Sequence, residues 1–357
     1  MKALIILILL ETIVMSPASS QQPPPFYENK SDLLIYLDDG GKAHTISTSA
    51  DWQIRRNHIL ANMQEAMGPF PDRSDLPPLD LRVTGSEVVE GVVRQEISFL
   101  SEPGDRVPAY LLIPQGLDAR APAMLCLHQT TKIGKGEPAG MGGLPNLHYA
   151  LELAQRGYVT LAPDYPNFGD YEFDPYANGY VSATMKGIWN HMRAVDLLQS
   201  LPQVDPERIG CIGHSLGGHN TMYVSVFDDR IKAMVSSCGF NSFFKYYGGD
   251  LTGWSHKGYM PRIAERYGKD PARMPFNFTE IAGALAPRPF FINAPLHDAN
   301  FDVSGVQDCV QAARPVYELL GAADQLVAVH PDAQHDFPPD VRKQAYAFLD
   351  SVFSRHP

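Results

Sequence analysis

The sequence has few cysteines and no excess of positive charge. Cysteine accounts for 4 of 357 residues, and 29 lysine and arginine residues stand against 40 aspartate and glutamate residues, for a formal net charge of −11. Proteins that bind nucleic acid need positive charge to neutralise phosphates, and this chain has no basic run. The charge balance therefore predicts no nucleic-acid partner, although it says little about the substrate.

Motifs for metals and cofactors are also missing. The chain holds no C-x-x-C or H-E-x-x-H spacing, and no G-x-G-x-x-G follows the first predicted strand. We therefore predict no metal site and no cofactor. The cysteines fall in or at the end of apolar runs or on a helix face, which predicts buried free thiols at Cys126, Cys211, Cys238 and Cys309. The alternative is a bridge between Cys126 and Cys211 on neighbouring strands, which would strain the sheet.

A long apolar run occurs at the N-terminus and nowhere else. Lys2 precedes an apolar stretch over residues 3–10, and the small residues at 18–20 form a candidate cleavage site. This pattern predicts a cleaved signal peptide over 1–20 and hence a secreted or periplasmic protein. No later stretch approaches the roughly 20 apolar residues that span a bilayer, so we predict no membrane anchor after cleavage.

The remaining chain divides into an N-terminal arm and one large domain. Residues 21–80 are rich in proline, and apolar residues recur at helical spacing within 51–67, which predicts one helix in the arm. Residues 81–357 have the length and composition of a single α/β domain.

The domain begins with a predicted β-hairpin and continues with alternating strands and helices. Strands at 92–99 and 107–113 flank the turn sequence S-E-P-G-D. Apolar strands that alternate with amphipathic helices predict a mostly parallel sheet with helices on both faces, in the order of the α/β-hydrolase fold. Further strands are predicted at 124–127, 158–162, 208–212, 231–236, 289–293 and 326–330, and helices at 147–156, 182–201, 303–320 and 339–353.

A candidate nucleophile follows the predicted strand at 208–212. Residues 213–217 read G-H-S-L-G and match G-x-S-x-G, the sharp strand-to-helix turn that exposes a catalytic serine. Side chains two residues before and after the serine would collide with neighbouring elements, which explains the two glycines. A five-residue match is weak alone, but the strand before it and the helix after it make Ser215 a specific prediction.

The acid and the base are expected after the serine, in that order. Among 12 histidines, His335 lies in the loop between the last predicted strand and the last helix, at the carboxyl end of the sheet. Asp298 follows the strand at 289–293 and is placed to accept a hydrogen bond from the imidazole. Asp302 is the rival carboxylate, but it is expected to cap the helix that starts at 303. We predict a triad of Ser215, Asp298 and His335.

Acyl transfer also needs donors that stabilise the oxyanion. The backbone N–H of Leu216, directly after the nucleophile, is the first expected donor. The second is expected from the loop after the strand at 124–127, at the backbone N–H of Thr130 or Gln129. His128 in the same loop is expected to brace the loop.

Several segments of the chain resemble one branch of the α/β-hydrolases. The stretches V-D-P-E-R-I-G at 204–210, G-D-R-V-P-A-Y-L-L-I-P at 104–114 and A-P-D-Y-P-N-F-G at 162–169 are similar to dienelactone-hydrolase and acetyl-xylan-esterase-like enzymes. The likeness runs from about residue 50 to the end, and it implies a serine hydrolase of carboxylic esters with the triad named above. The chain departs from true dienelactone hydrolases, which use a cysteine nucleophile, and Gln129 replaces a glycine that many relatives carry.

The segment between the sixth and seventh predicted strands, residues 240–285, is expected to form a lid. Its aromatic residues suit sugar rings or an aryl acid, or else they pack the lid onto the sheet. These features predict an exported serine esterase of small-molecule or polysaccharide esters, such as acetyl or feruloyl esters of plant-wall polysaccharide. The alternatives are a peptidase or thioesterase with the same triad, and a non-catalytic binding protein of the same fold.

Overall fold

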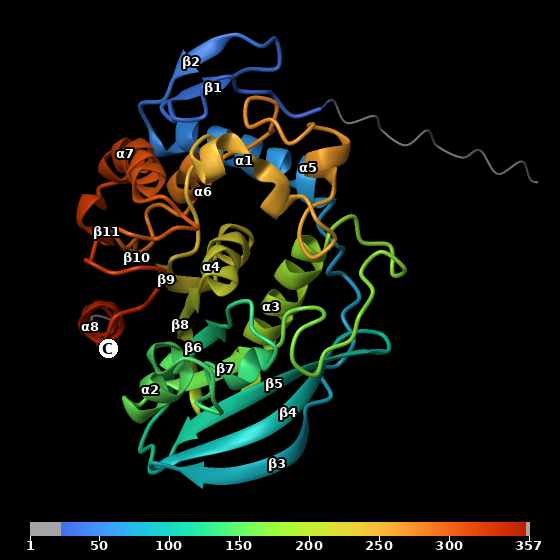
Figure 1. Cartoon of the computed structure of the whole chain (residues 1–357), viewed down its shortest axis with the longest axis vertical. Coiled ribbons are helices and arrows are strands. Elements are labelled where there is room, and N and C mark those ends of the chain that lie inside the picture. The colour runs from blue at the N-terminus through green and yellow to red at the C-terminus, as the bar shows by residue number, and fades with distance from the viewer. Residues whose placement is uncertain (1–22, 355–357) are drawn as a thin grey trace, which may run out of the picture.

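The computed structural model describes residues 23–354, and a nine-stranded sheet lies at its centre (Figure 1). The strand order is β11-β10-β9-β8-β6-β7-β5-β4-β3. All pairs from β11 to β7 are parallel, while β7, β5, β4 and β3 pair antiparallel, so the predicted mostly parallel sheet is confirmed. The strands are β3 (Arg82–Val89), β4 (Val92–Glu102), β5 (Asp105–Pro114), β6 (Ala121–Leu127), β7 (Val159–Pro163), β8 (Val204–His214), β9 (Ile231–Ser237), β10 (Phe290–Asn293) and β11 (Leu326–Val329).

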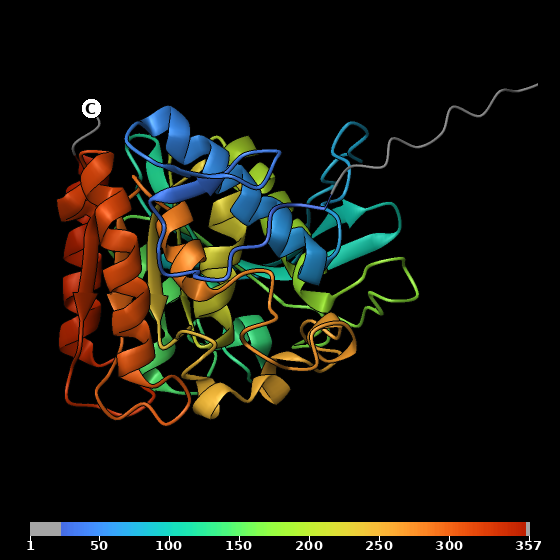
Figure 2. The same cartoon turned by 90° about the horizontal axis from the view of Figure 1, so that it is seen from above.

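Helices cover both faces of the sheet, as the alternating pattern predicts (Figure 2). Neighbouring residues of β6 divide between the two faces: Leu125 belongs to the apolar cluster of α3, α4 and α7, whereas Cys126 belongs to that of α2 and α8. The helices are α1 (Ser49–Met67), α2 (Tyr149–Gln155), α3 (Ala183–Ser200), α4 (Leu216–Phe227), α5 (Arg262–Glu265), α6 (Phe278–Ala284), α7 (Val303–Leu319) and α8 (Pro339–Ser354).

The N-terminal arm packs onto the domain through α1. Ile59 and Met63 of this helix are fully buried in the larger apolar cluster. The guanidinium of Arg55 donates a 2.6 Å hydrogen bond to Glu280 on α6, and both side chains are fully buried. The arm is therefore joined to the segment that follows β9 by apolar contacts and by a buried ion pair.

The sequence prediction missed three strands near the N-terminus. The arm contains a small antiparallel sheet of β1 (Ile35–Leu37) and β2 (Ala43–Thr45), and β3 extends the large sheet beyond the predicted hairpin. These strands are mostly exposed or half-buried and show no apolar alternation. An edge strand with little buried surface carries no periodic apolar signal, which explains the omission.

A long insertion separates β9 from β10, which are the sixth and seventh strands of the sequence prediction. It contains α5 and α6 and a compact aromatic cluster in which Phe243, Trp254 and Phe278 pack edge to face or tilted. These rings are at most 2% exposed, so they pack the insertion onto the domain. Phe244 and Tyr247 remain exposed at its surface.

All four cysteines are free and buried, as predicted: Cys126, Cys211, Cys238 and Cys309. Within residues 23–354, no helix is both long enough and apolar enough to cross a bilayer. The predicted signal peptide at 1–20 lies outside the described residues.

Candidate active site

Ser215 occupies a strained turn between β8 and α4. Its φ of 53° and ψ of −115° are unusual for a residue with a side chain, and its N–H donates to the Ser237 carbonyl at 2.8 Å. A Cβ atom on Gly213 would lie 2.2 Å from the Gly217 carbonyl oxygen. A Cβ atom on Gly217 would lie 1.8 Å from the carbonyl oxygen of Leu127. Both glycines are thus required by close backbone approach, as the motif predicts.

The same close approach brings the loop after β6 against the first turn of α4. His128 in this loop is buried, and its Nδ1 donates to the Gln129 carbonyl at 2.6 Å while its Nε2 accepts from the Tyr165 N–H at 3.0 Å. Burial lowers the pKa of His128, so the ring is neutral and carries its proton on Nδ1. His128 therefore braces the loop, as predicted, beside the half-buried Gln129 and the exposed Thr130.

The first turn of α4 supplies the other expected donor. Leu216 is the first residue of the helix, and the leading N–H groups of a helix have no intrahelical acceptor. The N-terminus of a helix also carries partial positive charge, which favours an anion there. The N–H of Leu216 therefore has no intrahelical acceptor, at the end of α4 where Ser215 lies.

Asp298 and His335 form a direct hydrogen-bonded pair. The Nδ1 atom of His335 lies 3.0 Å and 2.9 Å from the two carboxylate oxygens of Asp298. The N–H groups of Asn300 and Phe301 also donate to Asp298, at 2.8 Å and 3.0 Å. Burial alone would raise the pKa of Asp298, but the hydrogen bond and charge of His335, with the two N–H donors, lower it. The carboxylate is therefore ionised and holds the imidazole by Nδ1, which leaves Nε2 available.

Two neighbouring carboxylates, one of them the rival Asp302, have other partners. Asp302 caps α7, as predicted, since its side chain accepts from the Ser304 N–H at 2.8 Å. Asp336, directly after His335, accepts a 2.8 Å hydrogen bond from the side chain of Asn146.

A buried polar network beneath this pair was not foreseen from the sequence. The Nδ1 of His214 lies 2.9 Å from the hydroxyl of Ser237, and the amide of Asn293 donates to that hydroxyl at 2.8 Å. The same amide donates to the carbonyl of Asp336 at 2.9 Å. The network thus joins the carboxyl ends of β8, β9 and β10 to the loop of His335. Its only sequence signal was a polar residue at the end of each apolar run.

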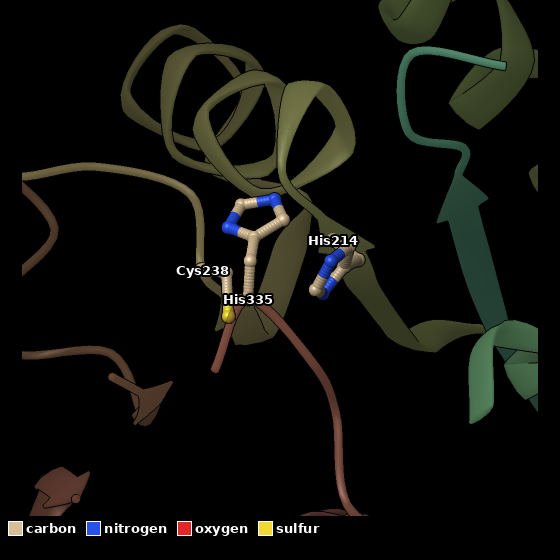
Figure 3. A group of neighbouring side chains, drawn as sticks. All are labelled: His214, Cys238 and His335. Carbon is tan, nitrogen blue, oxygen red and sulfur yellow. The ribbon is translucent and has the colours of Figure 1, made fainter. Parts of the chain in front are cut away.

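Figure 3 shows His335 beside the start of α4, with His214 and Cys238 close to it. The rings of His214 and His335 meet edge to face, with centroids 4.8 Å apart. One candidate ligand atom from each of the three residues lies within 4.8 Å of the others, which makes them the one group among residues 23–354 that could hold a metal ion. Burial raises the pKa of the Cys238 thiol well above its usual range, and Nδ1 of His335 is engaged by Asp298. The donor set therefore fits a proton-transfer site better than a metal site.

The buried imidazoles around the serine are neutral. Burial lowers the pKa of both His214 and His219 to about 3. His219, on the second turn of α4, packs edge to face against Trp254 and Tyr259 from the insertion, with centroids 4.8 Å and 5.5 Å away. The insertion thus reaches the helix that Ser215 begins.

The fold and the arrangement at the carboxyl edge of the sheet define an α/β-hydrolase: a strained serine after β8, a buried aspartate after β10 and its histidine partner after β11. A family model described as the prolyl oligopeptidase family matches residues 146–356, more than half of the chain. The chain belongs to the prolyl oligopeptidase family.

Two known relatives match most of the chain. The protein YtaP of Bacillus subtilis (strain 168) is 29% identical over 297 residues, covering 79% of this chain and 95% of that protein. The 4-O-methyl-glucuronoyl methylesterase 1 of Wolfiporia cocos (strain MD-104) is 23% identical over 341 residues, or 88% of this chain and 79% of the relative. The solved structure of a glucuronoyl esterase from Solibacter usitatus has a TM-score of 0.69 at 18% identity and covers 91% of this chain and 98% of its own, which shows a shared fold.

Proposed function

We propose that this chain is a serine esterase that cleaves carboxylic esters through an acyl-enzyme on Ser215. The observation that carries the proposal is the hydrogen-bonded pair of Asp298 and His335 at the sheet edge where Ser215 sits on its strained turn. Such a turn is retained only where the surrounding structure supports it, which indicates a function for the serine. The named activity of the Wolfiporia cocos and Solibacter usitatus relatives supports ester hydrolysis.

In the proposed reaction, Nε2 of His335 takes the proton of the Ser215 hydroxyl as its oxygen bonds to the ester carbonyl carbon. The oxyanion that forms lies against the N–H of Leu216 and an N–H of Gln129 or Thr130. The imidazolium then gives its proton to the alcohol oxygen as the carbon–oxygen bond breaks. A water molecule then attacks the acyl-enzyme with the same proton transfers through His335, and the carboxylic acid is released. Asp298 holds the ring and stabilises its charged form throughout.

The proposed substrates are esters of plant-wall polysaccharide, such as acetyl or feruloyl esters. The sequence resemblance to acetyl-xylan-esterase-like enzymes and the named carbohydrate esters of the relatives both support this class. We also propose export of the protein, which the apolar run at residues 3–10 and the small residues at 18–20 support.

Hydrolysis of p-nitrophenyl acetate by the wild type and by Ser215→Ala tests the proposal. The wild type should hydrolyse the ester. The rate of Ser215→Ala should fall to at most about 10³- to 10⁴-fold above the rate without enzyme. A labelled fluorophosphonate should modify Ser215 alone. Equal rates for the two proteins, or a label on another residue, would contradict the assignment. A panel of acetyl, feruloyl and methyl esters would then define the acyl group.

A peptidase is the second candidate, because the matching family model is named for an oligopeptidase. The same triad chemistry cleaves an amide if the leaving amine is protonated by the imidazolium. Turnover of peptidyl-proline nitroanilides measured beside the ester panel separates the two functions. A larger kcat/KM for the peptide than for the esters would show that the chain is a peptidase and not an esterase.

A further inference from the structure

A wide groove lies beside the candidate active site, between the loop after β7 and the tip of the insertion. Its volume is about 990 Å³, and its walls include Phe168, Phe173 and Tyr176 on one side and Lys257 on the other. The hydroxyl of Tyr176 donates to the carbonyl of Lys257 at 2.5 Å, which joins the two walls. In Figures 1 and 2 the loop after β7 and the insertion lie side by side.

The groove lies near the start of α4, directly after Ser215. Phe168 lines the groove and also packs against the apolar cluster that contains Leu216, the residue after the serine. The ring of Phe168 lies 5.6 Å from that of His128, which braces the expected oxyanion loop. Tyr259, next to the groove residue Gly258, packs against the same cluster. Phe168 and Tyr259 therefore link the lining of the groove to the start of α4, where Ser215 lies.

The lining combines half-buried rings with exposed carboxylates. Phe168, Phe173 and Tyr176 are half-buried, while Glu172 and Asp174 are exposed at the rim. Aromatic faces suit the C–H faces of pyranose rings, and carboxylates accept hydrogen bonds from sugar hydroxyls. The two carboxylates outnumber the single ammonium of Lys257 in the lining, so the charge balance disfavours an anionic chain and favours a neutral glycan.

We propose that this groove binds the neutral pyranose chain that carries the ester, as a glycan subsite near Ser215. The inference rests on the proposed esterase function, because it supplies the glycan part of the substrate which that function requires. It assigns to the loop after β7 the choice between polymer-borne esters and small esters.

Selectivity between two esters tests the groove. The quantity measured is the ratio of kcat/KM for acetylated xylotetraose to kcat/KM for p-nitrophenyl acetate. Tyr176→Ala should lower this ratio about tenfold relative to the wild type. A tenfold change corresponds to about 1.4 kcal/mol, the size expected for the loss of one aromatic contact. Glu172→Ala, an exposed change, should lower the same ratio about threefold and does not depend on folding of the Tyr176 loop. Phe26→Ala, an exposed ring on the N-terminal arm, is the matched control and should leave the ratio unchanged.

Binding of plain xylotetraose separates the groove from the esterase proposal. Calorimetry with Ser215→Ala should detect binding, and adding Tyr176→Ala should weaken the Kd about tenfold. If the wild type cleaves esters but neither the ratio nor the Kd responds to the groove variants, the groove proposal is overturned and the esterase proposal stands. If xylotetraose binds through Tyr176 but no ester is cleaved, the esterase proposal fails and the groove stands as a glycan site.

Discussion

Replacing Gly217 by alanine should remove most of the proposed activity without unfolding the protein. The new Cβ atom would lie 1.8 Å from the carbonyl oxygen of Leu127 and 3.0 Å from that of His128. One of the two backbones must then withdraw by about 1.5 Å to restore ordinary van der Waals contact. The hydroxyl of Tyr149 donates to the same Leu127 carbonyl, so β6 resists this movement.

The size of the expected loss in kcat depends on which atoms move. The loop after β6 carries the N–H expected to bind the oxyanion, and a misplacement of about 1 Å costs on the order of 10²-fold in rate. Complete loss of one such donor costs about 10²- to 10³-fold. We therefore expect kcat on p-nitrophenyl acetate to fall 10²- to 10³-fold with little change in KM, and the overpacking itself to destabilise the fold by about 1–3 kcal/mol.

Gly283→Ala provides the matched control. Its Cβ atom would lie 2.5 Å from Cδ1 of Leu33, the end of a side chain on the N-terminal arm. Urea unfolding should show a smaller loss of stability than Gly217→Ala, because the end of a side chain can turn aside, and kcat should stay close to that of the wild type. If Gly217→Ala keeps kcat within about threefold of the wild type, the close approach of α4 and the loop does not position the oxyanion donor.

Three further substitutions test the site and the fold. Asp298→Asn should lower kcat about 10³- to 10⁴-fold, because the amide cannot stabilise the charged imidazole it contacts. Steady-state kinetics of this variant and of Asp302→Asn measure the loss, and equal losses in the two variants would contradict the choice of acid. Asn293→Ala should lower kcat about 10- to 100-fold, because the carbonyl of Asp336, next to His335, loses its buried hydrogen-bond donor. An unchanged kcat would exclude a positioning role for Asn293. Glu280→Gln should reduce the free energy of unfolding in urea by about 3 kcal/mol, because Arg55 stays buried without a counter-charge; a loss below about 1 kcal/mol would show that the pair adds little.

The core of the fold could be predicted because its strands are buried on both faces. Continuous apolar runs such as 158–162 and 208–212 correspond to β7 and β8, and the predicted helix at 303–320 corresponds to α7. The observed strands extend beyond the predicted ones where the ladder continues into polar residues, as at His214 of β8, which pairs with Ser237 of β9. The exposed strand β3 could not be predicted, because it buries too little surface to impose an apolar pattern.

The candidate site was predictable only in part, since its residues lie in separate loops. Chain order and the position of each loop after a strand pointed to Ser215, Asp298 and His335, and the structure places the last two in hydrogen-bond contact. The network of His214, Ser237 and Asn293 escaped prediction, because a polar residue at a strand end has no periodicity that reveals its partner. The groove beside the site escaped for a similar reason, as its walls come from two segments about eighty residues apart.

By itself the sequence determined the buried strands and the long helices of the domain, their order along the chain, and the sharp turn at residue 215, because apolar periodicity and glycine requirements act over a few residues. Only the tertiary structure decided that Asn293 supports the loop of His335, that the insertion packs against α4, and that the loop after β7 forms a groove with Lys257. These relations depend on which strand ends become neighbours in the sheet and at what register. Neighbours in a parallel sheet are joined through long crossovers, so the local sequence does not specify the contacts between their ends.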